Sequence, residues 1–148
     1  MASAAKRGGK VKIREMTDED ISVVLDMDKK MVGEQRAITY RDPLSFYIGA
    51  ELSVSFAAEV DGKVVGFALG RLRDPNTGWL QTLAVDPKYQ HQGIGAKLVE
   101  ALVKRCRSKG AKTIHTMVSW RDARMLSFFN SLGFTRGEMI DLQKPLQE

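Results

Sequence analysis

The chain has 148 residues, of which 43% are hydrophobic and 28% charged, and its formal net charge is +5. This length and balance are typical of one globular domain with a buried core, which excludes a disordered or fibrous protein. Its apolar runs are shorter than the ~18 residues that a membrane-spanning helix needs, so we expect no membrane partner. The single cysteine, Cys106, cannot form an internal disulfide, and we expect a buried, unreactive thiol in a reducing, cytoplasmic setting.

Residues 1–10 are basic and no apolar segment follows them, so we expect a flexible tail rather than a secretory signal. A single domain is then predicted over residues 11–148. Positive charge gathers in this tail and around a predicted helix near residues 97–112. Such an excess favours anionic partners. Nucleic acid is the less favoured one, because no aromatic residues for base stacking are interleaved with the basic tail.

The first part of the chain predicts one strand followed by two helices. The strand covers Val11–Arg14, and Thr17 then opens a capping box with Asp20. Apolar residues at helical spacing follow as far as Met31. A second helix is predicted near Pro43–Leu52, since proline is favoured in a first helical turn.

An antiparallel meander of three strands is predicted next. The β-rich runs Val54–Val60 and Lys63–Leu72 flank the dipeptide Asp61-Gly62, which suits the positive φ angles of a type I′ turn. A second turn at residues 74–78 returns the chain into the apolar strand Trp79–Val85.

The later part of the chain changes to a strand–helix–strand pattern. A helix over about Gly93–Lys109 is followed by a strand at Thr113–Val118, which should run parallel to the strand before the helix. A helix at Asp122–Leu132 and a short strand at Met139–Leu142 complete the chain. The predicted fold class is therefore mixed α/β (α+β), with a mostly antiparallel sheet of about six strands flanked by about four helices.

The segment between Val85 and the following helix has the strongest functional signal. Gly93 and Gly95 lack Cβ atoms, so an anionic group could approach their backbone closely. The first N–H groups of a helix have no intrahelical partner, and the helix dipole adds partial positive charge there. These features suit a phosphate or pyrophosphate, although an ordinary glycine-containing loop would show the same glycines.

Other nucleotide and metal chemistries fit less well. The loop lacks the third glycine of a dinucleotide-binding fingerprint, and no Gly-x4-Gly-Lys-Ser/Thr segment exists. One cysteine and two separated histidines do not make a metal cluster, so we expect no metal.

Four landmarks follow one another along the chain. They are the starting strand and helix, the hairpin Glu59–Gly66, the motif Gln90-x-x-Gly93-x-Gly95 preceded by Leu83-Ala-Val-Asp-Pro87, and the segment Phe128-Phe-Asn-Ser-Leu-Gly-Phe134. In this order they resemble the GNAT superfamily of acyl-CoA-dependent N-acyltransferases. The resemblance covers about residues 11–144. It implies a sheet that splays between the strands at 79–85 and 113–118, with acetyl-CoA as co-substrate.

The resemblance also implies where acetyl-CoA binds. The pantetheine arm would hydrogen-bond to the backbone near Leu83–Val85, and the pyrophosphate would rest on the amides of Gln92–Ala96. The cofactor-binding residues that it implies are Leu83, Ala84, Val85, Gln90, His91, Gln92, Gly93, Ile94, Gly95, Ala96, Asp122 and Phe129.

Two positions depart from the family pattern. Phe129 stands where many members have a tyrosine that protonates the departing thiolate, and phenylalanine cannot donate a proton. Asp122 stands where an asparagine commonly contacts the cofactor. An aspartate can still cap a helix, but it is a poorer neighbour for an anion.

The expected reaction is attack of a primary amine on the thioester of acetyl-CoA, which requires a deprotonated amine. His115, in the middle of the parallel strand, is a candidate general base, with a structural histidine as the alternative. Glu34, between the first two helices, is a second candidate, with a surface carboxylate as the alternative. Gln81, which we expect on the same face as Leu83 and Val85, could position a water but cannot serve as a base.

Two functions from different classes follow from the sequence. The first is an N-acetyltransferase that acts on a small-molecule or peptide amine. The second is an acyl-CoA-binding regulator with the same fold and little turnover, which Phe129 and Asp122 motivate. The short segment after Phe134 could leave a sheet edge exposed, so a homodimer is a further hypothesis.

Overall fold

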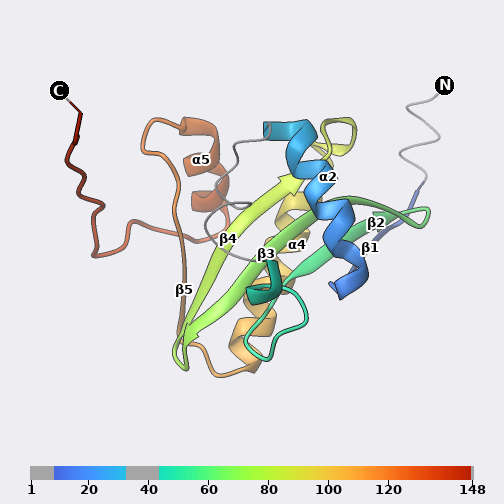
Figure 1. Ribbon diagram of the computed structural model, residues 1–148, viewed down its shortest axis with the longest axis horizontal. Coiled ribbons are helices and arrows are strands. Elements are labelled where there is room, and N and C mark those ends of the chain that lie inside the picture. Colours follow the sequence, from blue (N-terminus) through green and yellow to red (C-terminus); the bar gives the residue numbers. More distant parts are fainter. Residues whose placement is uncertain (1–8, 33–43, 148) are drawn as a thin grey trace. The chain divides into compact units, whose positions relative to one another are not determined.

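A single sheet of five strands forms the centre of the computed structural model, which describes residues 9–32 and 44–147 (Figure 1). The described strands are β1 Val11–Glu15, β2 Phe56–Val60, β3 Lys63–Asp74, β4 Thr77–Val85 and β5 Thr113–Thr116. They lie in the order β1-β2-β3-β4-β5; the first four are antiparallel neighbours, and β5 runs parallel to β4. The predicted mixed, mostly antiparallel sheet is confirmed.

The helices of the described residues are α2 Ile21–Val32, α4 Ile94–Ser108 and α5 Ala123–Ser131, with short 3₁₀ turns η1 Asp18–Asp20, η2 Leu44–Phe46 and η3 Pro87–Tyr89. By contact, the chain divides into one unit that ends at Thr116 and another that begins at Met117. In the first unit, α2 lies in front of the strands and α4 behind them (Figure 1). None of the described helices is long and apolar enough to cross a membrane.

Two predicted elements are absent from the described residues. Of the helix predicted near Pro43–Leu52, Pro43 lies outside the described residues and the remainder forms only the single turn η2; turns follow it, and Gly49 has a φ of +76°, which a helix does not allow. A Cβ at Gly49 would lie 2.7 Å from Oδ1 of Asp18, so this turn packs closely against the start of the α2 segment. The strand predicted at Met139–Leu142 does not form, since these exposed residues pair with no described strand.

The predicted hairpin between β2 and β3 is confirmed. Asp61 and Gly62 have φ angles of 52° and 77°, the left-handed values that a type I′ turn requires at both central positions. Val60 pairs directly with Lys63 across this turn. The tight turn therefore fixes the register of the two strands.

Glycines let α4 lie close to the sheet. A Cβ at Gly70 would come within 2.7 Å of Leu102, and one at Gly78 would come within 2.7 Å of Cys106 Sγ. A Cβ at Gly66, nearer the start of β3, would meet Leu98 at 3.3 Å. These contacts identify the face of the sheet that α4 covers, and the helix stripe that covers it is fully buried.

The opposite face carries the second part of the core. Its buried cluster joins residues of α2, of the strands and of the segments that follow β1 and η2: Met16, Val24, Tyr47, Ile48, Ala57, Phe67, Leu69 and Ala84. An ion-pair group secures the start of α2 at the edge of this cluster. Arg14 donates to both carboxylate oxygens of the buried Asp20 at 2.8 Å and to Glu59 at 2.7 Å. These bonds hold the pKa of the Asp20 carboxyl below its usual range.

The second unit contains α5. Asp122 caps this helix, since its Oδ1 accepts a hydrogen bond of 3.1 Å from the amide of Met125. Phe129 is buried and makes edge-to-face contacts with Phe128 and Phe134, each with ring centroids 5.1 Å apart. Gly133, with a φ of 94°, follows the end of the helix.

Candidate active site

The ladder between β4 and β5 stops halfway along β4. Paired residues run only from Thr77 opposite Thr113 to Leu80 opposite Thr116, although β4 continues to Val85. The hydroxyl of Thr116 donates a hydrogen bond of 2.9 Å to the carbonyl of Leu80, the last paired residue of β4. Among the described strands, the backbone of β4 beyond Leu80 therefore has a ladder partner only on its β3 side. This is the splay that was predicted for the sheet.

A bulge in β4 lies next to this point. Leu69 of β3 pairs with Thr82 while its neighbour Gly70 pairs with Leu80, so Gln81 is the extra residue. The bulge reverses the alternation of faces. Gly78, before it, faces α4, whereas Ala84, after it, lies in the opposite core.

The prediction that Gln81 shares a face with Leu83 and Val85 is therefore wrong. Val85 contacts the α4 face near Gly66, and Leu83 follows it by alternation. The Gln81 side chain instead accepts a hydrogen bond of 2.7 Å from Trp79 Nε1. A one-residue insertion in a strand has no local sequence signal. The prediction assumed regular alternation of side chains along β4, and the insertion interrupts that alternation.

The end of β4 leads into an array of exposed backbone amides. Gly93 takes a left-handed φ of 81° and caps α4, and the first helical hydrogen bond runs from Lys97 N to the carbonyl of Gly93. The N–H groups before Lys97 consequently lack partners within the helix. A Cβ at Gly93 would meet no atom within 4 Å, so this end of α4 is open. With the dipole of a 15-residue helix behind it, it suits an anion.

Side chains of the loop hold this array against β4. Gln90 Nε2 donates a hydrogen bond of 2.9 Å to the carbonyl of Val85, and Asp86 accepts one of 2.9 Å from the amide of Lys88. His91 has a φ of 63°, which is uncommon outside glycine. The structure thus brings the predicted residues Leu83–Val85 and Gln90–Ala96 together in one turn between strand and helix.

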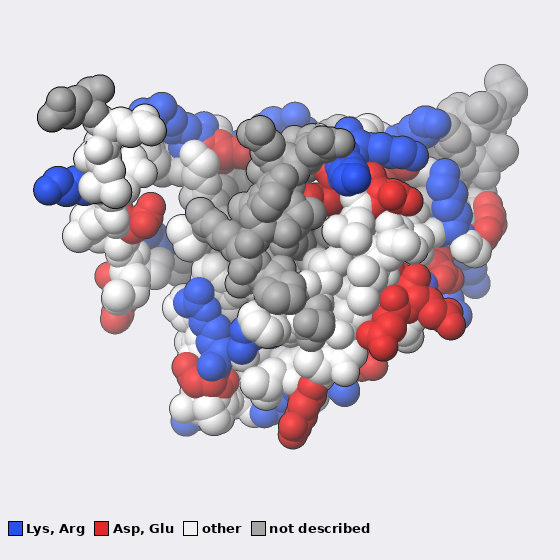
Figure 2. Space-filling view, viewed as in Figure 1, with Lys and Arg blue, Asp and Glu red and all other residues white. Residues whose placement is uncertain are grey.

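Four polar or aromatic side chains gather on the sheet face opposite α4. Because Gly70 and Gly78 face α4, their neighbours Arg71 and Trp79 face the other way. The Arg73 guanidinium lies 3.8 Å from the centroid of the Trp79 ring, and Trp79 holds Gln81. Figure 2 shows basic side chains over this end of β3 and β4.

The predicted bases have different outcomes. His115 is exposed on β5 and pairs with Trp79. Its neighbour Ile114 lies at the α4 face, so the His115 side chain belongs to the face of Trp79. Glu34 lies outside the described residues. Asp122 and Phe129 belong to the second unit, where they cap α5 and pack among aromatic rings.

The sequence reasoning missed Arg71 and Arg73. Their signal was present, since two arginines at a spacing of two interrupt an otherwise apolar strand. Side chains alternate between the two faces of a strand, so a spacing of two predicts that both arginines lie on one face. Two arginines in an apolar strand are uncommon and could have indicated a binding site.

The predicted inert cysteine is confirmed. Cys106 is buried against Gly78, and burial raises the pKa of its thiol to about 11. Within the described ranges, no three His, Cys, Asp or Glu residues are grouped so that they could hold a metal ion.

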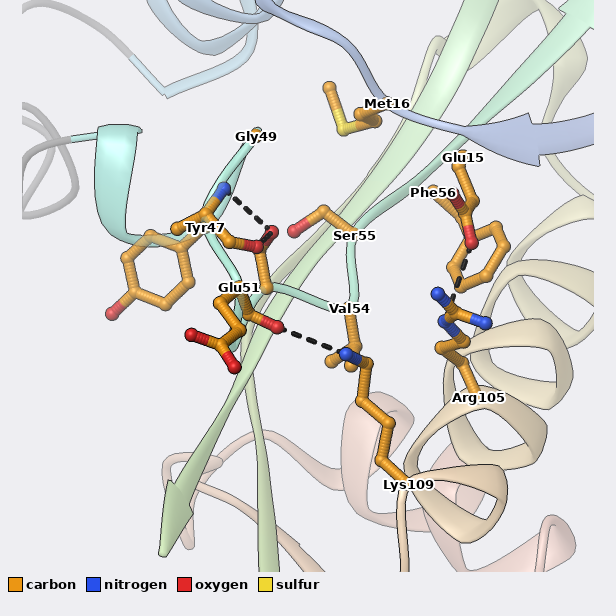
Figure 3. A pocket seen from close by; sticks show the side chains of 12 residues that line it. Glu15, Met16, Tyr47, Gly49, Glu51, Val54, Ser55, Phe56, Arg105 and Lys109 are labelled. Carbon is orange, nitrogen blue, oxygen red and sulfur yellow. Dashed lines mark hydrogen bonds and ion pairs between the residues drawn. The ribbon is translucent and has the colours of Figure 1, made fainter.

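A cavity of about 400 Å³ lies at the other end of α4, and Figure 3 shows the side chains that line it. Lys109 Nζ donates to the carbonyl of Glu51 at 2.9 Å, and Arg105 pairs with Glu15 at 3.3 Å. Arg105 lies roughly three helical turns, or about 18 Å, beyond Gly93. The cavity is thus separate from the amide array, and its two cations already have partners.

Comparisons with known proteins agree with this geometry. The model of the acetyltransferase (GNAT) family matches residues 21–134. An L-2,4-diaminobutyric acid acetyltransferase of Nocardia farcinica is 32% identical over 88 residues, which are 58% of this chain and 46% of that protein. An amino-acid acetyltransferase of Azotobacter vinelandii is 31% identical over 124 residues, 83% of this chain and 27% of that protein. The chain thus spans less than half the length of these two relatives.

Solved structures share the fold. An aminoglycoside N-acetyltransferase in complex with CoA superposes with a TM-score of 0.80 at 19% identity, over 95% of this chain and 98% of that one. The match of the family model over most of the chain shows that this protein belongs to the GNAT family of acetyltransferases.

Proposed function

We propose that this protein is an N-acetyltransferase that moves the acetyl group of acetyl-CoA to a primary amine. One observation carries this proposal: the open amide array at Gly93 directly follows the half-paired strand β4. The array suits the pyrophosphate of CoA, and the free strand edge suits an amide-containing arm such as pantetheine.

The residues present fit this co-substrate. The amides of Gln92–Ala96 would hold the pyrophosphate next to His91, with the exposed Lys88 and Lys97 adding positive charge nearby. The backbone of Leu83–Val85 would hydrogen-bond the pantetheine arm. One of its amides would also stabilise the oxyanion that develops on the thioester carbonyl.

The amine attacks the carbonyl carbon, a C–N bond forms and the C–S bond breaks. We propose His115 as the base that takes the amine proton, directly or through a water, because it shares the face of Trp79 beside the splay. Phe129 has no proton to donate, so the departing thiolate takes its proton from solvent. Glu34 remains the second candidate base.

The relatives support the reaction class. Two of them are named as acetyltransferases of amino acids, and another as a ribosomal-protein alanine N-acetyltransferase of Escherichia coli. We therefore propose an acceptor amine on a small molecule or on a peptide. We further propose that residues 11–148 form one domain and that the protein acts in the cytoplasm. We also propose that the protein forms a homodimer, which light scattering would test.

A regulator that binds acyl-CoA with little turnover is the second candidate, and Phe129 favours it. Release of the CoA thiol, followed with a thiol reagent across a panel of amines, separates the two. Amine-dependent thiol release supports the enzyme. Saturable acetyl-CoA binding without thiol release from any amine would instead support the regulator.

A further inference from the structure

Arg71 is held in the face opposite α4 with an unused donor. Its Nε is buried and has no hydrogen-bond partner among the residues that the structure describes, which is costly for a charged guanidinium. Its guanidinium carbon lies 5.3 Å from the centroid of the Phe46 ring, so the ring fixes its place without satisfying its N–H groups. A half-buried arginine whose Nε–H has no partner among the described residues suits a bidentate acceptor.

Arg73 lies two residues further along β3, at an irregularity between Leu72 and Asp74, and its guanidinium reaches the same face. It stacks on Trp79, whose indole N–H is bound to Gln81. None of the ion pairs formed among the described residues involves Arg71 or Arg73. Two positively charged side chains therefore lie on this face, and no carboxylate in the described part of the chain forms an ion pair with either of them.

The face adjoins the proposed reaction centre. Arg71 pairs with Trp79, four residues before Leu83 on β4, which corresponds to a distance on the order of 10 Å along the strand. His115, the proposed base, pairs with the same Trp79. A small acceptor could thus place its amine at the splay and an anionic group at Arg71.

We propose that Arg71, supported by Arg73, binds a carboxylate of the acceptor, so that the acceptors are amines that carry a carboxylate. The planar guanidinium matches a carboxylate in two parallel hydrogen bonds, which fixes the direction of the acceptor as well as its affinity. The inference rests on the proposed acetyltransferase function and assigns the class of its acceptor.

The test compares each of several free amino acids with its own α-carboxamide as acceptor, using kcat/KM from thiol release. The wild type is expected to prefer the free acid by about tenfold to a hundredfold, the worth of a charged hydrogen-bonded pair. The amine of the carboxamide has the lower pKa, so amine protonation cannot produce this preference. A peptide with an acidic side chain near its amino terminus shows whether a side-chain carboxylate serves equally.

Arg71→Ala is expected to lower kcat/KM for the acids far more than for the carboxamides, so that the ratio of the two approaches one. Arg71→Lys keeps the positive charge but not the planar fork of donors, so its acid-to-carboxamide ratio should lie between those of the wild type and Arg71→Ala. Arg107→Ala is the matched control, because it removes an exposed arginine from α4, on the other side of the sheet. If Arg71→Ala does not fold, the acid-to-carboxamide ratio of kcat/KM is compared between the wild type and Arg73→Ala instead.

Equal use of acids and carboxamides by the wild type would overturn the inference while leaving the acetyltransferase function intact. An equal loss for both acceptor classes in Arg71→Ala would do the same. If no amine is acetylated, calorimetry of the amino acids and carboxamides with the CoA-bound protein decides. Acid-specific binding lost in Arg71→Ala supports the carboxylate site and contradicts the enzyme, whereas its absence contradicts both.

Discussion

The Gln90 side chain donates a hydrogen bond of 2.9 Å to the carbonyl of Val85, the last residue of β4. The bond crosses the turn between the strand and the amide array of α4, so it ties the two parts of the proposed acetyl-CoA site together. We expect Gln90→Ala to weaken acetyl-CoA binding by about twofold to tenfold, the effect of one neutral hydrogen bond. Calorimetric titration measures this change.

Gln92→Ala is the matched control for that variant. It shortens a glutamine in the same loop whose exposed side chain makes no hydrogen bond within the described residues, and it keeps the backbone amide. An equal loss of affinity in both variants would mean that the Gln90–Val85 bond does not position the array.

Gly93→Ala should disable the amide array at small cost to the fold. A φ of 81° strains any residue with a Cβ, by about 1–2 kcal/mol. The new Cβ meets no protein atom within 4 Å and would project into the space proposed for the pyrophosphate. We expect the dissociation constant of acetyl-CoA to rise by at least about tenfold.

Gly110→Ala is the matched control, because Gly110 has a φ of 96° and similarly open space at the other end of α4. Its melting temperature should fall about as much as that of Gly93→Ala, while its acetyl-CoA affinity stays that of the wild type. Similar acetyl-CoA affinities of Gly93→Ala and Gly110→Ala would show that backbone strain, rather than loss of the amide array, accounts for any weakened binding.

Gly78 and Cys106 should be energetically coupled. A Cβ at Gly78 would lie 2.7 Å from Cys106 Sγ, and α4 cannot retreat without opening its buried stripe. Gly78→Ala is therefore expected to lower the free energy of unfolding by about 1–3 kcal/mol. Cys106→Ala in the same chain should recover part of this loss in urea unfolding. Strictly additive losses in the double-mutant cycle would contradict the predicted close contact.

Asp20 should make stability depend on acid pH. Its hydrogen bonds to Arg14 hold the pKa of the folded carboxyl below the unfolded value near ~3.9. The stabilisation is therefore fully present above that value and is lost as pH falls through the lower, folded pKa. Asp20→Asn should cost about 1–3 kcal/mol at pH 7.

The difference in unfolding free energy between wild type and Asp20→Asn should then narrow below about pH 4. Chemical unfolding at a series of pH values measures it, with Asp26→Asn, an exposed carboxylate of α2, as control. A difference in unfolding free energy that stays constant across this pH range would show that the ionised Asp20 carboxylate does not stabilise the fold.

Local chemistry explains what could be predicted from the sequence. The Asp61-Gly62 turn, the Asp122 cap and the amide array at Gly93 each depend on residues close together in the chain. Short-range rules for turns and caps are sufficient for such features. Four family landmarks in order then indicated the fold class and the half-paired sheet.

Long-range packing explains what was missed. The bulge at Gln81 depends on the pairing of β4 with β3, and it decides which side chains share a face with Trp79. The segment after residue 43, predicted as a helix, instead packs Gly49 closely against Asp18, a contact between residues far apart in the sequence. The meaning of Arg71 also depends on its neighbours in space, since a strand sequence alone shows neither Phe46 nor the unused Nε.

Calorimetric titration of the wild-type protein and Gly93→Ala with acetyl-CoA tests the central claim most directly. The proposed site predicts saturable binding of one acetyl-CoA per chain to the wild type, and binding weakened by at least about tenfold in the variant. Absence of binding to the wild type, or equal affinity of both proteins, would contradict an acetyl-CoA site at the start of α4.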